Sequence, residues 1–338
     1  MSQASYLLRV LSGVRLKKMN EVIDFVHEKS GKSKISIFFD ILNCAVRYGA
    51  GYYDYKIFAF WDMNKEQRKT YVTRLWNKKL IMLVNDQSKT HIFNNKNEFF
   101  ERFCDYLGRD FIDMTKDVSE EQFCEFAAKY DVIFAKPQVG ESGKGIERLK
   151  PADFESLPAM YKYVKEKHFG TVEQELKQHE ALNTLYPLSI NSLRIVTLVC
   201  DGVAHCVYQV VKIGNAGKFV DNMENSGLAC PLDPETGDIV GVAHTSSLVN
   251  YDTHPYTGVK LLGYHIPYVP EAIELCKKAA LEVEGVRYIG WDVCITPEGP
   301  VLIEGNDYPG YDFWQLPEHT PDKIGLLPYY KKMVPELK

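Results

Sequence analysis

Three oxygen-bearing side chains near the C-terminus are spaced so that they can meet at one point. Asp292 lies in one predicted strand, and Glu304 and Asn306 lie two positions apart in the next. Residues two apart leave the same face of a strand, and a hairpin would bring Asp292 beside them. Magnesium takes one or two carboxylates together with phosphate oxygens and water, so the pattern predicts a magnesium site. The alternative is a hairpin with incidental polar residues on a solvated face, against which Gly305 favours close approach to a ligand.

A lysine and a glycine-rich loop form a second candidate. Lys136 lies near the end of the apolar run Asp131–Pro137, and the loop begins four residues later. A lysine there is a point charge for a phosphate, and glycines let backbone N–H groups approach phosphate oxygens. The loop lacks the lysine-hydroxyl ending of a Walker A sequence, and an ordinary turn is the alternative. Its candidate phosphate-binding residues are Gly140, Ser142, Gly143, Lys144 and Gly145.

A third candidate is the acidic segment Thr171–Glu180, which ends a predicted strand in hydrogen-bond acceptors. Its backbone could meet a purine and a carboxylate could meet ribose hydroxyls, although Glu173 and Glu175 fit an outward strand face equally well. His179, beside Glu180, could act on an amine, but a lone histidine is more often structural.

The elements that must position these residues change character along the chain. Apolar residues three and four apart predict a mainly helical region from Tyr6 to Leu83. Further helices are predicted at Asn95–Tyr106, from Ser119, at Glu155–Lys167 and at Pro270–Glu284. Strands are predicted at Asp131–Pro137, Ile146–Leu149, Gly170–Leu176, Ser192–Cys200, Ala204–Ile213, Tyr288–Thr296 and Val301–Glu304. Hairpins without repeated βαβ units predict an α+β architecture with antiparallel sheets.

Composition narrows the classes of partner and compartment. The 338 residues carry a net charge of −5, so there is no overall basic field for nucleic acid. The eight cysteines lie singly without a CxxC pair, which predicts reduced core residues in a cytoplasmic protein. No stretch reaches the roughly 20 apolar residues of a membrane span. The basic amphipathic start, Met1–Lys34, is not a secretion signal; it fits a helix packed on its own domain, or one on an anionic membrane surface.

The order lysine, glycine loop, acidic segment, arginine strand and closing Asp…Glu-x-Asn resembles the ATP-grasp superfamily. More narrowly, the chain is similar to the sugar-transfer-associated ATP-grasp group, which is alpha-L-glutamate ligase-like. The similar segments are Glu173–Leu182, Tyr186–Thr197, Asp221-Asn222 and Asn306–Gln315. The resemblance runs from Asn95 to Gln315, and its closing Glu-x-Asn with the upstream Asp is the specific part.

The resemblance implies an ATP-grasp fold, in which two α+β subdomains clasp ATP after a helical N-terminal lobe. Residues 1–88 would form that lobe, 89–180 the small lid subdomain with the glycine loop, and 181–338 the large subdomain with the metal and substrate site. Arg194 would neutralise the transferring phosphoryl group, and Glu304 would bridge two magnesium ions. The residues implied for the nucleotide are Lys96 and Lys136 at the phosphates, Glu173, Glu175 and Leu176 near adenine, and Glu180 at ribose.

The implied activity is that of an ATP- and magnesium-dependent carboxylate–amine ligase that works through an acyl-phosphate. By analogy with the family, the substrate would be a sugar acid or an amino acid in surface polysaccharide biosynthesis. The alternatives are a kinase of the same fold acting on a hydroxyl and a non-catalytic nucleotide-binding protein. Two features depart from the family, since the first lobe is helical and Ser226 replaces an expected glycine near Asn222. Asn222, His179 and Trp314 are the candidate substrate contacts, and Trp314 fits core packing as an alternative.

Overall fold

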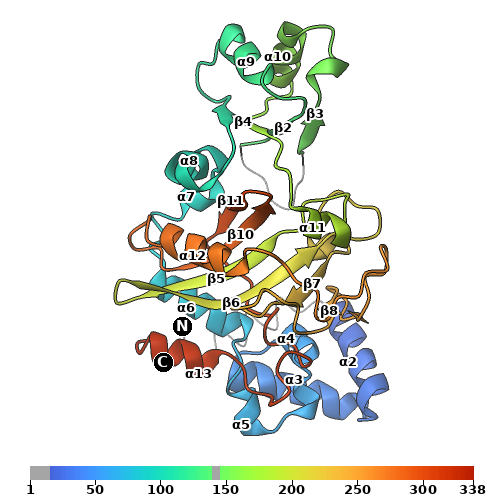
Figure 1. Cartoon of the computed structure of the whole chain (residues 1–338). Helices are drawn as coiled ribbons and strands as arrows, with labels where there is room; N and C mark the ends of the chain where they lie inside the picture. The colour runs from blue at the N-terminus through green and yellow to red at the C-terminus, as the bar shows by residue number, and fades with distance from the viewer. Residues whose placement is uncertain (1–15, 139–144) are drawn as a thin grey trace. The chain divides into compact units, whose positions relative to one another are not determined.

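The polypeptide separates into two compact units in a computed structural model, which describes residues 16–138 and 145–338. One unit combines Met1–Leu83 with Gly310–Lys338, and the other is Val84–Pro309. In the described residues, the first unit is helical and the second carries two antiparallel sheets with helices against them (Figure 1). The α+β architecture predicted from the sequence is therefore confirmed.

The helical unit begins with two helices whose ends are fixed by their flanking residues. The Ser33 hydroxyl accepts a hydrogen bond from the Ser36 N–H and caps the second helix. Gly49 ends that helix with φ 65°, a left-handed conformation that glycine adopts without steric cost. The helices of this unit are α2 (Leu16–Ser30), α3 (Lys34–Tyr48), α4 (Tyr52–Ile57), α5 (Lys65–Arg68), α6 (Arg74–Val84) and α13 (Leu327–Met333), with a 3₁₀ turn at Phe60–Asp62.

The last residues of the chain return to this helical unit. The Gln315 side chain accepts from the Val72 N–H at 2.9 Å and donates to the Val72 carbonyl at 3.0 Å. The Tyr311 hydroxyl donates to Asp54 at 2.7 Å. Residues 310–338, which the sequence predicts as part of the large subdomain, therefore group with the N-terminal helices because their buried polar groups are satisfied there. The division into lid and large nucleotide-binding subdomains stays a prediction.

The first sheet of the other unit has four strands in the order β1-β4-β2-β3. Helices α9 and α10 contribute Phe123 and Met160 to the core against this sheet, as Figure 1 shows for the two helices. Ser119 and Gln122 form a capping box at the start of α9, as the serine before an acidic turn predicts. The strands are β1 (Phe111–Asp113), β2 (Ile133–Lys136), β3 (Glu147–Leu149) and β4 (Thr171–Gln174), and the helices are α9 (Glu120–Ala127) and α10 (Leu157–Glu166), with a 3₁₀ turn at Pro151–Asp153.

The second sheet has seven strands in the order β11-β10-β5-β6-β7-β8-β9. Helix α12 lies against β11, β10, β5 and β6, and α7 and α8 also lie against the edge strand β11. The strands are β5 (Leu193–Cys200), β6 (Val203–Ile213), β7 (Leu228–Pro231), β8 (Ala243–His244), β9 (Asn250–Tyr251), β10 (Tyr288–Thr296) and β11 (Gly299–Asn306). The helices are α7 (His91–Asn94), α8 (Lys96–Arg102), α11 (Glu180–Leu185) and α12 (Val269–Ala279), with 3₁₀ turns at Cys104–Tyr106 and Met223–Asn225.

The hairpin β5–β6 confirms a turn read from the sequence. Asp201 and Gly202 have φ values of 50° and 75°, and the ladder resumes directly with Cys200 opposite Val203. Two successive left-handed residues make the type I′ turn that matches the twist of paired strands. Other boundaries differ: α8 ends at Arg102 and a 3₁₀ turn follows, α12 stops at Ala279, and β11 extends to Asn306. Helix and strand ends commonly fray by such amounts.

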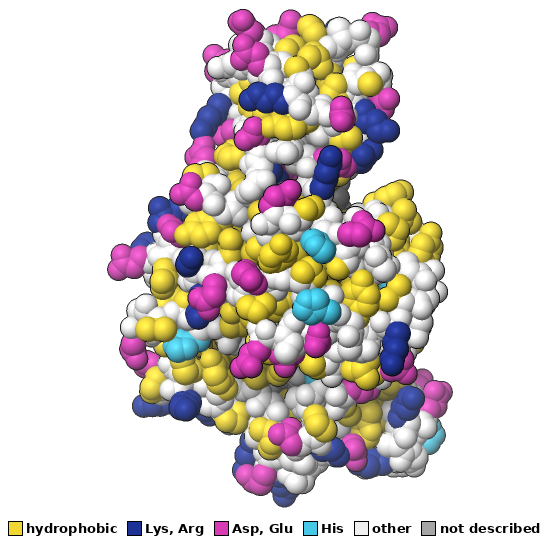
Figure 2. Space-filling model, viewed as in Figure 1, with side chains coloured by type: hydrophobic (Ala, Val, Ile, Leu, Met, Phe, Trp, Pro, Cys, Tyr) yellow, Lys and Arg dark blue, Asp and Glu magenta, His cyan; other side chains and the backbone are white. Residues whose placement is uncertain are grey.

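The exposed surface carries both signs of charge. Acidic and basic side chains are interspersed over the face seen in Figure 2. In residues 16–138 and 145–338, no helix combines the length and apolar character needed to cross a bilayer.

We expect Asp54 to make the helical unit less stable as the pH rises. Burial raises its pKa from 3.8 to about 6, against the opposing hydrogen bonds from Tyr311 and Gly51. The folded state therefore holds this proton more tightly than the unfolded state, and stability is lost between about pH 4 and pH 6. The difference in melting temperature, Asp54→Asn minus wild type, should rise between pH 4 and pH 7. Asp24→Asn, at an exposed site, should show a flat difference from pH 5 to pH 7; a flat difference for Asp54→Asn would contradict the assignment.

Candidate active site

The centre of the seven-stranded sheet holds a buried carboxylate paired with an arginine. Asp292 on β10 lies directly opposite Arg194 on β5. The Arg194 Nε donates to Asp292 Oδ1 at 2.6 Å and an Nη donates to Oδ2 at 3.1 Å. Only 13% and 6% of the two side chains are exposed. A two-pronged contact of this kind fixes the orientation of both groups.

A second cation reaches the same carboxylate. Lys212 on β6 places Nζ 3.0 Å from Asp292 Oδ2 and 3.7 Å from Asp221 Oδ1. The Ser192 N–H donates to the other oxygen of Asp221 at 2.9 Å. Two buried cations therefore face two buried carboxylates, and the group is close to electrically neutral.

The opposite charges in this buried group favour the ionised forms of both Asp292 and Lys212. Burial alone would raise the pKa of Asp292, but the adjacent Arg194 and Lys212 charges lower it well below its usual range. For Lys212 the signs are reversed: burial would lower its pKa, whereas the charges of Asp221 and Asp292 raise it. The balance of charge outweighs the cost of burial at each of these sites.

Glu304 lies beside Asp292 as the sequence pattern predicts. The two residues are opposite one another in the β10–β11 ladder. Glu304 is exposed to solvent, whereas Asp292 is buried. Desolvation by surrounding protein atoms raises the pKa of Glu304, and the Asp292 carboxylate raises it further. An added cation between the two carboxylates would relieve this repulsion.

The donor set suits magnesium. Asn306 is opposite Gly290, and its side-chain N–H donates to the Gly290 carbonyl at 3.2 Å, so its oxygen is the atom left to face a cation. Two carboxylates and an amide oxygen are hard donors of the type that magnesium prefers. In the described part of the chain, no group of three or more His, Cys, Asp or Glu residues is arranged so that it could hold a metal ion. The expected donors include only two such residues, so this finding leaves the magnesium assignment as a prediction.

Gly305 has a role that the sequence did not reveal. A Cβ built there would lie 2.8 Å from Phe93 Cδ1 and 3.0 Å from Phe99 Cε2. Such distances are too short, so the absent side chain makes room for α7 and α8 to pack on β11. Close approach of these helices accounts for this glycine without a ligand.

On the four-stranded sheet, Lys136 forms an ion pair with Glu173. The other Glu173 oxygen accepts from Arg109 Nε at 3.1 Å. Burial would raise the pKa of Glu173, but the charges of Arg109 and Lys136 lower it. Glu173 is therefore an ionised, inward-pointing carboxylate, and the outward strand face considered for it does not occur.

The other predicted nucleotide residues are spread over neighbouring segments. Lys96 is the first residue of α8, and its N–H donates to the Gln138 carbonyl at 3.4 Å. Glu175 pairs with Arg148 at 3.0 Å, and Leu176 is half-buried. Of the loop residues, Gly145 has φ 75°, and Gly140, Ser142, Gly143 and Lys144 lie outside the described residues.

The segment from His179 joins the two sheets of this unit. The His179 N–H donates at 2.7 Å to the carbonyl of Ile295, which lies on β10, the strand that also carries Asp292. The His179 ring accepts from the Ala181 N–H at 3.1 Å and so caps α11. This capping contact is a structural role for His179, the alternative considered in the sequence analysis to a role in acting on an amine. Glu180, the first residue of α11, is exposed.

The candidate substrate residues belong to two units, with His179 and Asn222 in Val84–Pro309 and Trp314 in the helical unit. Asn222 precedes the 3₁₀ turn that follows Asp221, whose carboxylate lies beside Lys212. Ser226 closes this turn with φ 73°, the conformation for which a glycine is ordinarily preferred. Trp314 is half-buried in the helical unit. It directly precedes Gln315, whose side chain accepts a hydrogen bond from the Val72 N–H.

Sequence reasoning missed two buried cations of this site, Lys212 and Arg109. Lys212 interrupts the apolar run Val210–Ile213, and a charge in such a run is a usable signal of a buried partner. Arg109 follows Gly108 in a polar segment, where its pattern gives no such signal.

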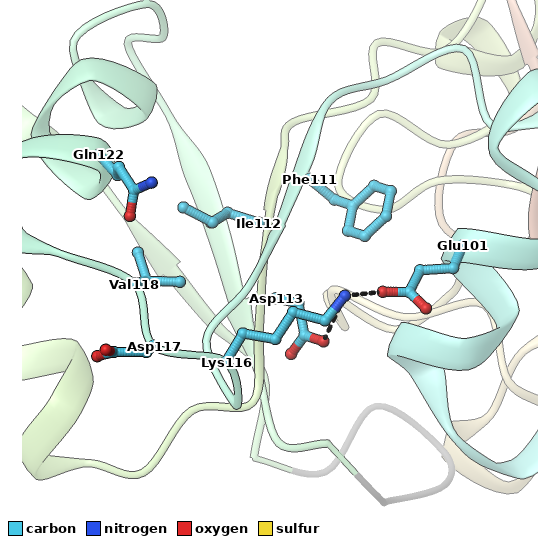
Figure 3. A pocket seen from close by; sticks show the side chains of 8 residues that line it. All are labelled: Glu101, Phe111, Ile112, Asp113, Lys116, Asp117, Val118 and Gln122. Carbon is cyan, nitrogen blue, oxygen red and sulfur yellow. Dashed lines mark hydrogen bonds and ion pairs between the residues drawn. The ribbon is translucent and has the colours of Figure 1, made fainter.

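A separate depression of about 430 Å³ lies at the free edge of β1. Figure 3 shows the Lys116 ammonium pointing toward the carboxylates of Glu101 and Asp113. Its other lining residues are Phe111, Ile112, Asp117, Val118 and Gln122. None of the residues predicted for catalysis, ATP or magnesium lines this depression.

The sequence matches the family model of the sugar-transfer associated ATP-grasp proteins over residues 148–323, more than half of the 338-residue chain. The chain belongs to this ATP-grasp family, and the predicted family and fold are confirmed. A search of curated proteins gave no match.

Solved structures similar to this chain include a synthetase, a synthase and a ligase. The D-alanyl-alanine synthetase A of Vibrio cholerae has 16% identity and a TM-score of 0.39, over 72% of this chain and 60% of its own. The carboxyaminoimidazole ribonucleotide synthase of Aspergillus clavatus has 11% identity and a TM-score of 0.39, over 65% and 46%. The D-alanine-D-alanine ligase of Coxiella burnetii has 11% identity and a TM-score of 0.42, over 79% and 71%. The chain thus spans less than two thirds of the first two proteins.

Loss of Lys212 should destabilise the protein strongly. Lys212→Met leaves Asp221 without its nearest cation and Asp292 with only Arg194, so we expect the free energy of unfolding to fall by about 3 kcal/mol. Urea unfolding measures the change. The control Lys277→Met removes a surface pair with Glu274 and should cost less than about 1 kcal/mol. Equal losses in the two variants would show that the buried charges do not balance one another as described.

Proposed function

We propose that the chain is an ATP- and magnesium-dependent ligase that joins a carboxylate to an amine. The substrate carboxylate attacks the γ-phosphorus of ATP, so that ADP leaves and an acyl-phosphate forms. The amine then attacks the acyl carbon, phosphate leaves with the former carboxylate oxygen, and a C–N bond results. No protein nucleophile is needed, and catalysis comes from positioning and charge stabilisation.

The observation that carries this proposal is the opposed pair of carboxylates, Asp292 and Glu304, backed by two buried cations. A bound magnesium ion would neutralise phosphate oxygens and orient them for transfer. Asp292 and Glu304 would hold that ion together with the Asn306 side-chain oxygen. Arg194 uses Nε and one Nη on Asp292, and we propose that its other Nη faces the transferring phosphoryl group.

The proposed nucleotide site uses the four-stranded sheet. Lys136 would exchange its contact with Glu173 for a contact to ATP phosphates, while Arg109 keeps Glu173 ionised. The remaining proposed contacts are Lys96, Gly140, Ser142, Gly143, Lys144 and Gly145 at the phosphates, Glu175 and Leu176 at adenine, and Glu180 at ribose.

The family name favours a sugar-linked substrate, such as a sugar acid or an amino acid joined during synthesis of surface polysaccharide. We place this chemistry in the cytoplasm, where ATP is abundant and the eight cysteines would stay reduced. Asn222 and Trp314 are the proposed substrate contacts. The capping role of His179 supports a structural part for its ring in preference to a catalytic one.

The ligase reaction is tested by ATP turnover with magnesium, a panel of sugar acids, amino acids and amines, and hydroxylamine as a trap. We expect ADP and hydroxamate only when a carboxylate is present. Glu304→Ala should lower both by roughly 100-fold or more, because it removes a direct metal donor. Glu298→Ala, an exposed carboxylate of the same hairpin, is the matched control and should retain activity.

Two results would contradict the ligase proposal. ADP accompanied by a stable phosphorylated product and no hydroxamate would establish a kinase. ATP binding without turnover across the panel would favour a non-catalytic nucleotide-binding protein.

Trp314 provides a test of the acceptor site. An aromatic face is a common platform for a sugar ring, so Trp314→Ala should raise the acceptor KM by roughly 10-fold if one such contact is worth about 1.4 kcal/mol. The KM for ATP should stay within a factor of two. Unchanged acceptor kinetics would instead assign Trp314 to packing within the helical unit.

A further inference from the structure

A β-bulge interrupts the hairpin at the candidate metal site. Asp292 is opposite Glu304, but the next residue, Val293, is opposite Leu302. Ile303 is therefore the extra residue, and it directly precedes Glu304. A bulge bends its strand and re-aims the neighbouring side chains, and such irregularities are common next to active sites.

Arg109 holds the backbone of this bulge. One Nη donates to the Leu302 carbonyl at 2.7 Å, and the other donates to the Ile303 carbonyl at 3.3 Å. The first Nη also donates to the Leu107 carbonyl at 3.2 Å. β11 is the edge strand of its sheet, so these carbonyls meet a side chain where another strand is lacking.

The same guanidinium extends to the nucleotide side. Its Nε donates to Glu173, whose other oxygen meets Lys136. The Arg109 side chain is wholly buried and its guanidinium lies 4.7 Å from the centre of the Phe100 ring. One planar group thus joins the Lys136–Glu173 ion pair, which is part of the proposed ATP site, to the two residues that precede Glu304.

We propose that Arg109 is a positioning residue that holds the Ile303 bulge and so orients Glu304 toward the metal. Through Glu173 it also links this orientation to the position of Lys136 on the four-stranded sheet. This inference rests on the proposed magnesium site. Lysine cannot replace arginine here, because a single ammonium cannot span Glu173 and two carbonyls in a fixed planar fork.

The test uses Mn²⁺ as the metal probe on the full chain, in the presence of a non-hydrolysable ATP analogue. Free Mn²⁺ is followed by electron paramagnetic resonance, and analogue affinity is measured separately without metal. We expect Arg109→Lys and Arg109→Gln to weaken Mn²⁺ binding by roughly 10-fold or more, the range found for partners that orient a metal ligand. Analogue affinity in Arg109→Lys should change less than threefold, because a cation still faces Glu173.

Arg287→Lys is the matched control. Arg287 also donates from Nε to a backbone carbonyl of the seven-stranded sheet, that of Val199 at 2.8 Å, and its Nη donates to Cys200, so both of these guanidinium hydrogen bonds go to β5. It should leave Mn²⁺ affinity unchanged. Each variant is measured well below its own melting temperature, so that only folded protein is compared.

The inference is overturned if the folded Arg109 variants bind Mn²⁺ as wild type does, whatever their melting temperatures, since that outcome assigns the residue to stability alone. It is also overturned if Arg109→Lys behaves as wild type in every measurement. The result does not depend on turnover: failure of wild type to form hydroxamate would reject the ligase, whereas the Mn²⁺ comparison would still decide the role of Arg109.

Discussion

The site depends on the burial of one carboxylate, that of Asp292, between two cations. A charge in the middle of a sheet is costly unless partners meet it directly. Arg194 does so from β5, which pairs with β10, and Lys212 does so from β6, the next strand of the sheet. Asp221 then balances the second cation. Removing any one member leaves a buried charge without full compensation, so these strands must keep their register for the group to exist.

This arrangement gives the two proposed metal donors different exposure to solvent. Asp292 is already neutralised by protein groups and is rigidly oriented, whereas Glu304 opposite it reaches solvent and retains a raised pKa. A buried carboxylate held by two cations beside a solvent-exposed one would suit an ion that must also accept phosphate oxygens and exchange water. The bulge at Ile303 directly precedes the exposed residue of the pair, Glu304.

Local sequence patterns predicted much of the fold and part of the site. Asp201-Gly202 specified its turn, β-branched runs marked β5 and β10, and the Asp292–Glu304 pairing followed from strand periodicity and a hairpin. Three features depend on contacts distant in sequence and could not be read this way: the Arg109 contacts to Leu302 and Ile303, the bulge itself, and the return of residues 310–338 to the helical unit. Gly305 illustrates the limit, since its small size serves α7 and α8.

The return of the C-terminal segment also orders events during synthesis. The Gln315 side chain makes two hydrogen bonds to the Val72 backbone, and the two residues are separated by 243 positions. At about 5–20 residues per second, a ribosome needs roughly 10–50 s to make the intervening chain. The helices of this unit therefore lack this partner, with part of their surface uncovered, until Gln315 has been synthesised. The helical unit therefore cannot finish folding before residues 310–338 are made, and the nascent chain has a defined interval in which chaperone protection of these helices matters most.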